Sequence, residues 1–336
     1  MTPLAAEPDP AAVRPARRRR LFLLLIVTAG IAVVIAAGAF FWTTNRWRWR
    51  LYTPTLIEKV GDLYFIVDCW HHRVLYSPEL EPRVGRWHVL DDDIAGPHSI
   101  ASDGVLYVVD DTGRNGIRSY RRDGDGFRLV QKVGGLGRRT HRVRYDKETA
   151  AFYVLSAHNP SITKLVRDGE QLIVRYTKPL DFLDGEYTRS FTVIDGFMYF
   201  VPGPRIIAKA RYRDDSYDLV ASYPVRRNLE GMNDLFRTDD GWYYVTSTDP
   251  ANVFRARSLE DFGTGRYEDV RRQLSLRGIP YFLSAIDGRV FITQINRWSG
   301  ILSFVHRDGN IADVRVLCES GPPNSSDLRR FEALPK

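Results

Sequence analysis

The chain has 336 residues, a net charge of +7 and 44% hydrophobic residues. A chain of this length holds either two average domains or one large all-β domain. The charge is uneven, because residues 1–50 contain eight of the 48 basic and two of the 41 acidic residues, which leaves 40 basic and 39 acidic residues for the remainder. The positive excess belongs to the N-terminus, and the composition of the body gives no reason to expect nucleic-acid binding.

The N-terminal segment predicts one membrane span. Residues 21–44 carry no charge, and about 20 apolar residues suffice to cross a bilayer as a helix. Four arginines at residues 17–20 precede this segment and tryptophans follow it, as is typical of the positive-inside tendency and the interfacial aromatic belt. We predict a disordered cytoplasmic tail (residues 1–20), a signal anchor (residues 21–44), a juxtamembrane linker (residues 45–51) and a periplasmic or extracellular body.

A cleaved signal peptide remains an alternative to the anchor. The triplet Ala37, Gly38, Ala39 resembles a small-residue cleavage site, although the apolar segment is longer than is usual for a signal peptide. Arginines also follow the segment, at residues 46, 48 and 50, so the orientation is less firmly indicated than the span itself. In either interpretation the body is exported.

The body contains a sixfold repeat, the feature to seek before single elements. In each unit a polar or ring-bearing residue precedes a few apolar residues, a turn with Gly or Asp, and a strand rich in Tyr, Phe and Val, which is typical of a hairpin. The units begin at Thr55, His98, His141, Ser190, Asn233 and Phe282, at intervals of 43, 43, 49, 43 and 49 residues. Each has room for two further strands, so we predict an all-β, six-bladed β-propeller over residues 52–318, followed by a C-terminal tail over residues 319–336.

The stretch V-D-C-W-H-H-R-V at residues 67–74 connects the second and third predicted strands. Its D-x-x-x-H-R-V pattern resembles the NHL repeat, in which an aspartate ends one strand and an arginine starts the next; residues 108–120 form a weaker version. We expect Asp68 and Arg73 to pair. We interpret His71-His72 as a half-exposed turn rather than a metal site, because adjacent strand residues point to opposite faces.

The architecture is similar to that of the six-bladed propellers that include NHL proteins, strictosidine-synthase-like proteins and calcium lactonases. In such propellers the first strand of every blade lines a central channel. The resemblance implies that the six residues that open the repeats form a ring at one channel mouth, where a ligand would bind. This ring comprises Thr55, His98, His141, Ser190, Asn233 and Phe282.

The predicted ring contains few of the residues that catalysis or metal binding requires. It lacks the carboxylates of a lactonase-type calcium site and the glutamate that a strictosidine-synthase-like protein implies. His98 and His141 suit zinc or iron, but the similar peptidyl-hydroxyglycine amidating lyases use three channel histidines. Arginines 138, 139, 142 and 144 beside His141 either contact an anionic ligand or form a solvated surface.

Two functions therefore remain open, and with them the question of whether the protein is an enzyme. One is a binding or scaffold module whose partner is an envelope protein or a glycan, in envelope or cell-surface polysaccharide processes. The other is a metal-dependent lyase or hydrolase that uses His98 and His141. The missing catalytic constellation favours the first, and the equivalent positions of the two histidines in consecutive blades favour the second.

The positions of the two cysteines predict a disulfide that closes the ring of blades. Cys69 follows the second strand of the first blade, and Cys318 ends the last strand of the sixth. These positions share one face of neighbouring blades if the ring closes, and disulfides persist in exported proteins. We predict a Cys69–Cys318 disulfide, with two buried free thiols as the alternative.

Overall fold

The computed structural model describes residues 10–203, 205–229 and 231–333. It divides into two compact units, the first ending at Arg46 and the second starting at Trp47. The first is formed by α1 (Pro10–Asn45). The segment Phe22–Trp49, with a mean hydropathy of 2.7, is the one helical stretch of the described chain that is long and apolar enough to cross a membrane, a test that a signal sequence also passes.

The predicted disorder of the N-terminal tail is wrong for residues 10–20, which continue α1. Alanine and arginine dominate this stretch and are among the strongest helix formers, which offsets its prolines. Residues 1–9 lie outside the described part of the chain.

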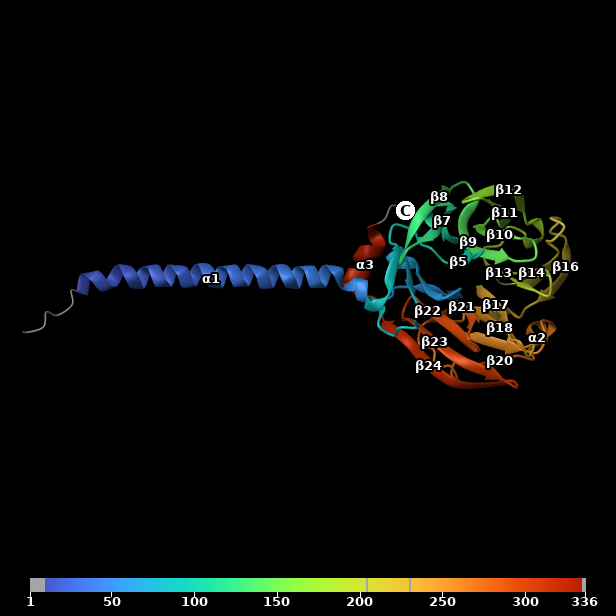
Figure 1. Ribbon diagram of the computed structural model, residues 1–336. Coiled ribbons are helices and arrows are strands. Elements are labelled where there is room, and N and C mark those ends of the chain that lie inside the picture. Colours follow the sequence, from blue (N-terminus) through green and yellow to red (C-terminus); the bar gives the residue numbers. More distant parts are fainter. Residues whose placement is uncertain (1–9, 204, 230, 334–336) are drawn as a thin grey trace, which may run out of the picture. The chain divides into compact units, whose positions relative to one another are not determined.

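The second unit is a six-bladed β-propeller, as predicted (Figure 1). Every blade is an antiparallel sheet of four strands that follow one another in sequence. The strands of the first three blades are β1 (Pro54–Val60), β2 (Leu63–Asp68), β3 (Arg73–Ser77), β4 (His88–Asp91); β5 (Ile100–Ser102), β6 (Leu106–Asp111), β7 (Gly116–Asp123), β8 (Gly126–Val133); β9 (Arg138–Asp146), β10 (Ala151–His158), β11 (Ser161–Asp168), β12 (Gln171–Pro179).

The strands of the last three blades are β13 (Thr188–Ile194), β14 (Phe197–Pro202), β15 (Ile206–Ala210), β16 (Leu219–Pro224); β17 (Met232–Arg237), β18 (Tyr243–Ser247), β19 (Val253–Ala256), β20 (Glu268–Asp269); β21 (Ile279–Ile286), β22 (Arg289–Ile295), β23 (Ser299–Arg307), β24 (Asn310–Gly321). The helices of this part are η1 (Arg46–Trp49), η2 (Cys69–His71), η3 (Val84–Arg86), η4 (Thr112–Arg114), η5 (Asp181–Leu183), η6 (Arg227–Leu229), α2 (Glu260–Thr264) and α3 (Ser325–Glu332).

The hydrophobic core is divided among the interfaces between blades. Between the second and third blades, Leu106 and Val108 of β6 pack in one cluster with Phe152 and Val154 of β10. The middle strands are buried on both faces, which explains why they read as runs of apolar β-branched and aromatic residues rather than as alternating patterns. This packing fixes the angle between blades and thereby positions the inner strands around the channel.

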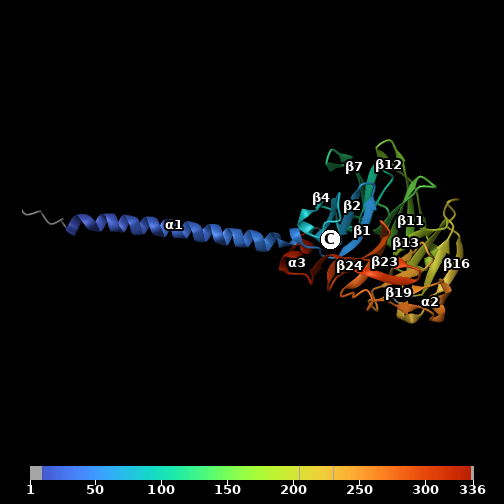
Figure 2. The same ribbon diagram turned by 60° about the horizontal axis from the view of Figure 1, so that its bottom comes forward.

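The two ends of the chain close the ring without sharing a strand. The backbone N–H of Leu51 donates to Oγ of Ser320 (2.7 Å), and that of Thr53 donates to Oγ of Ser299 (3.0 Å). Helix α3 starts with a capping box at Asn324, lies against the first blade (Figure 2) and contacts η2 of that blade. The segment before β1 therefore binds the sixth blade, while the segment after β24 binds the first.

The His71-His72 doublet belongs to this closure. Nε of Arg73 donates to Oδ2 of Asp68 (2.9 Å), which confirms the predicted pair. The ring nitrogens of His71 lie 2.8 Å from Asp68 and 3.1 Å from Asp327 of α3, and Nε2 of His72 lies 3.1 Å from a carbonyl oxygen of the same helix. The predicted half-exposed turn is wrong, because α3 covers it and both imidazoles are buried.

The predicted disulfide is absent, and Cys69 and Cys318 are both buried free thiols. Sγ of Cys69 lies 3.7 Å from Nε2 of His98. Cys318 packs with Ile57 and Ile301 in the apolar cluster between the sixth and first blades. The two residues thus belong to neighbouring blades, as expected, but their side chains have different surroundings.

Candidate functional site

The six predicted ring residues lie in or beside the innermost strands of the six blades, and all are buried. Three of them join one blade to the next. Oγ1 of Thr55 donates to the carbonyl of His98 (2.9 Å), Oγ of Ser190 donates to Oδ1 of Asp234 (2.6 Å), and Nδ2 of Asn233 donates to the carbonyl of Pro280 (2.8 Å). Their hydrogen bonds therefore serve the contacts between blades.

His98 and His141 are brought together, with stacked rings whose centroids are 3.8 Å apart. Nδ1 of His141 donates to the carbonyl of Arg189 (2.8 Å), and its Nε2 lies 3.2 Å from the hydroxyl of Tyr281. Burial lowers the pKa of His141 well below its usual value, and the charges of His98 and Arg189 lower it further. His141 is therefore a neutral ring that accepts from Tyr281.

Cys69 and His98 form a buried thiol–imidazole contact that lacks the properties of a nucleophilic pair. Nδ1 of His98 lies 2.9 Å from Oγ1 of Thr112, and its Nε2 faces Cys69. Burial raises the pKa of the Cys69 thiol well above its usual value, and the charges of Asp110 and Asp68 add to this effect. Because the thiolate is the reactive form, the thiol is held in its unreactive state.

The stacked histidines do not point at a common ion. An imidazole binds a metal through a lone pair in the plane of its ring, and these planes lie face to face at an angle of 28°. Among the residues that the structure describes, no group of three or more His, Cys, Asp or Glu side chains is placed to hold a metal. A shared zinc or iron would require one ring to turn.

Arg142 of β9 lies next to this layer, buried with 1% of its surface exposed. Its guanidinium lies over the ring of Phe282, 4.0 Å from the centroid, and none of its three nitrogens has a hydrogen-bond partner in the described part of the protein. Burial lowers its pKa to about 10, and the charge of Arg144 contributes. This arginine is therefore a desolvated cation rather than part of a solvated surface.

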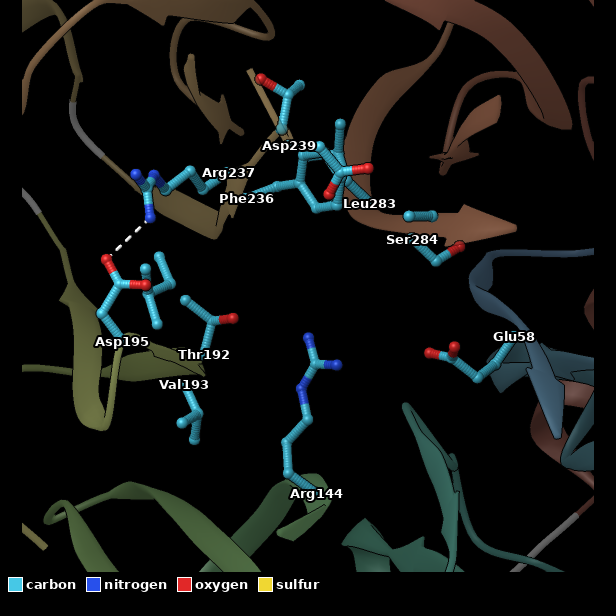
Figure 3. Close-up of a pocket in the computed structure, with 13 residues that line it drawn as sticks. Glu58, Arg144, Thr192, Val193, Asp195, Phe236, Arg237, Asp239, Leu283 and Ser284 are labelled. Atoms are coloured by element: carbon cyan, nitrogen blue, oxygen red, sulfur yellow. Dashed lines mark hydrogen bonds and ion pairs between the residues drawn. The ribbon is translucent and has the colours of Figure 1, made fainter. Parts of the chain in front are cut away.

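A cavity of about 570 Å³ lies at the end of the channel that is lined by the C-terminal halves of the inner strands (Figure 3). Glu58 of β1 and Arg144 of β9 point at each other across it, and Arg237 and Asp195 pair at 2.8 Å (Figure 3). Burial raises the pKa of Glu58, against the opposing charges of Arg144 and Arg142. The rest of the lining comprises Thr192, Val193, Ile194, Phe236, Thr238, Asp239, Leu283, Ser284 and Ala285.

This end of the channel was not predicted from the sequence, although two charged residues in the repeat indicate it. Glu58 and Arg144 each lie three residues after the opening residue of their repeat. The other blades have Ala101, Val193, Phe236 and Ala285 at that position, so the two charges stand out. Charged side chains on an inner strand, where neighbours are apolar, indicate a polar cavity or a buried ion pair.

No protein-family model matches the sequence, and no curated protein does. Solved structures of similar fold include virginiamycin B lyase from Staphylococcus aureus (TM-score 0.52, 11% identity, 78% of this chain and 84% of that chain) and a candidate 6-phosphogluconolactonase from Bacteroides fragilis (0.55, 16%, 79% and 86%). A protein from Lactobacillus plantarum is also similar (0.50, 11%, 81% and 82%). At these identities the likeness concerns fold alone, and by fold this chain is a propeller-type protein with six blades.

Proposed function

We propose that this protein is a membrane-anchored, extracytoplasmic propeller that binds a small polar ligand in the channel cavity between Glu58 and Arg144. The observation that carries the proposal is the cavity itself. Its volume of about 570 Å³ falls within the range of small-molecule sites, and polar groups from several blades converge on it.

The two facing charges support a ligand between them. Glu58 of the first blade and Arg144 of the third extend into the cavity without an ion pair between them in the described structure (Figure 3). By contrast, Arg237 of the same lining is already paired with Asp195. Glu58 and Arg144 are half-buried, and a partly desolvated charge without a partner is costly, so a ligand that supplies the missing hydrogen bonds would gain affinity from both residues.

The residues at the other end of the channel also favour binding over catalysis. The lowered pKa makes His141 a weak base, and the raised pKa keeps the Cys69 thiol protonated, so neither is poised as a base or a nucleophile. Export would place the cavity among envelope components. Sugars and fragments of surface glycans are therefore the first ligands to screen, with an envelope protein as the alternative partner.

The test is a thermal-shift screen of the full-length protein in detergent against polar metabolites and glycan fragments. Thr192→Trp fills the cavity from β13, and Leu219→Trp, on the exposed outer strand of the same blade, is the control. A true ligand should raise the melting temperature of the wild type and of Leu219→Trp but not of Thr192→Trp. Equal shifts in all three proteins, or no ligand at all, would contradict the proposal.

A metal-dependent lyase or hydrolase built on His98 and His141 is the second candidate. Its support is the contact of these rings from consecutive blades, with Cys69 beside them. Zinc and iron should be measured in the wild type and in a variant with both histidines changed to alanine. Near-stoichiometric metal that is lost in the variant would make this candidate the leading one, and metal-free protein after purification without chelators would remove it.

A further inference from the structure

The burial of Arg142 is not compensated by hydrogen bonds to its guanidinium in the described residues. Its side chain is among the largest fully buried ones, and Nε, Nη1 and Nη2 are all without hydrogen-bond partners in the described residues. Removing a guanidinium from water without compensation is unfavourable, as it is for any buried ion. A protein that needed only volume at this position would be more stable with methionine.

The carboxylates nearby do not neutralise Arg142 by direct contact. Oδ2 of Asp234 comes within 4.0 Å of its Nη2, but the two oxygens of Asp234 already accept from Oγ of Ser190 (2.6 Å) and from the backbone N–H of Leu283 (3.0 Å). Asp110 accepts the backbone N–H groups of two residues and the hydroxyl of Ser99. Donors of the inner strands thus hold both carboxylates in place.

Arg142 and Arg144 act from the same side of one strand. They are two residues apart in the regular part of β9, where they lie opposite Leu155 and Tyr153 of β10, and alternate residues of a strand project from one face. Arg144 lines the cavity, and Arg142, two residues earlier on the strand, lies behind that lining with all three guanidinium nitrogens buried. The ring of Phe282 supports this guanidinium by a cation–π contact, and a ligand that reached it from the cavity would supply the hydrogen bonds that it lacks in the described residues.

We propose that Arg142 and Arg144 form a receptor for the carboxylate of a small, hydroxyl-bearing acid that enters through the cavity. A planar guanidinium presents parallel N–H donors that match the two oxygens of a carboxylate. Glu58, Thr192 and Ser284 lie on the remaining walls and suit hydroxyl groups. The inference names the ligand class for the proposed function and rests on it.

The experiment uses the full-length protein in detergent with sodium formate, the smallest carboxylate, as the probe. Thermal unfolding is measured against formate concentration, with sodium chloride at equal ionic strength as the reference and inorganic phosphate as a second oxyanion. Arg142→Met removes the charge, and Arg128→Met is the matched control, because Arg128 is an exposed arginine outside the cavity that is paired with Glu170. Arg142→Lys provides a charged variant with the same position should the methionine variant fail to fold.

Formate should raise the melting temperature of the wild type and of Arg128→Met beyond the chloride reference, in proportion to the logarithm of its concentration above the dissociation constant. Its apparent affinity should fall about tenfold or more in Arg142→Met and also fall in Arg142→Lys, which cannot bind bidentately. Without formate, Arg142→Met should be at least as stable as the wild type. An unchanged response in both Arg142 variants, a wild type that responds only as to chloride, or destabilised Arg142→Met would overturn the inference.

The two proposals can fail separately. A neutral ligand that binds wild type but not Thr192→Trp, combined with no effect of formate, would sustain the cavity as a binding site and overturn the carboxylate receptor. A response to phosphate that exceeds the response to formate would overturn the assignment to a carboxylate. Loss of both the ligand and the formate response would overturn both proposals.

Discussion

The stacked histidines link the stability of the propeller to pH. Burial, His98 and the cationic Arg189 lower the pKa of His141 well below its usual value of 6.5, whereas the unfolded chain titrates near that value. As the pH falls below about 6.5, the unfolded state takes up a proton that the folded state refuses, so stability declines by up to about 1.4 kcal/mol per pH unit from this group. Above that pH the contribution of His141 is constant.

His141→Gln should flatten this decline. Glutamine does not titrate, yet it can still donate to the carbonyl of Arg189 and accept from Tyr281. The free energy of unfolding of both proteins should be measured between pH 5 and pH 8, where the variant is expected to lose less stability on acidification. Parallel curves would mean that the folded state accepts the proton on His141 after all.

The two thiols give a second prediction at the residue scale. Burial raises the pKa of Cys69 well above its usual value and that of Cys318 to about 12. A thiol reagent should therefore react slowly with the native protein, and it should find two thiols in protein that is denatured without reductant. Fewer than two thiols would instead support the predicted disulfide between the first and last blades.

Single-residue predictions succeeded where the relevant contact was local in sequence. Asp68 and Arg73 flank one strand connection, so their pairing follows from the motif alone. The burial of His71 depends on Asp327, 256 residues further along the chain, and no local pattern indicated that partner. The same limit applies to Arg142, whose neighbours Phe282 and Asp234 come from two other blades.

At the scale of elements, α3 acts as a clasp that joins the end of the propeller to its first blade. Asp327 accepts from Nε of Arg50 (3.0 Å) and contacts His71, which also contacts Asp68. Each ring nitrogen of His71 thus faces a carboxylate from a different part of the chain. Removing one member leaves the others buried without compensation.

Asp327→Ala should therefore destabilise the propeller by about 3 kcal/mol, as expected when one partner of a buried charged network is removed. Although burial alone would raise it, the pKa of Asp327 is lowered, chiefly by the hydrogen bond from His71. The contribution is present above the ordinary carboxyl pKa of 3.8 and is lost as the pH falls through the lower folded value. Chemical denaturation at pH 7 and pH 3 checks both statements, with Glu332→Ala as the control. A loss of stability below 1 kcal/mol at pH 7 would show that the contacts of α3 with the first blade contribute little to the stability of the propeller.

Helix α3 also illustrates which elements can be predicted from the sequence and which cannot. The inner hairpins repeat six times and were located from their period, whereas α3 occurs once and lies in what was read as a tail. Helix α1 was expected only over its apolar part. Its extension back to Pro10 reflects the helix propensity of alanine and arginine, which a search for apolar residues does not measure.

At the scale of the whole molecule, period and hydrophobicity determined what could be predicted. Six repeat starts at five near-constant intervals specify six blades, because each blade buries its apolar faces only against its neighbours. How the ring closes was not specified by the period, since closure depends on hydrogen bonds between chain ends, such as Leu51 with Ser320. The cavity was missed for a related reason, because it is built from residues of several blades whose side chains meet only after closure.

The remaining question at this scale is whether the apolar helix is retained. We expect the mature protein to keep its N-terminus, because residues 21–44 form an uncharged segment long enough to span a bilayer. The protein should stay in the membrane fraction after alkaline extraction and have an intact mass. Ile31→Arg with Val34→Arg places two charges at the centre of the span, at a cost of roughly 2.5–3.5 kcal/mol each, and should release the protein or prevent its insertion. A soluble mature chain that starts near Ala39 would show instead that the segment is a cleaved signal. In that case α3 would hold the start of the first blade in a protein without a membrane anchor.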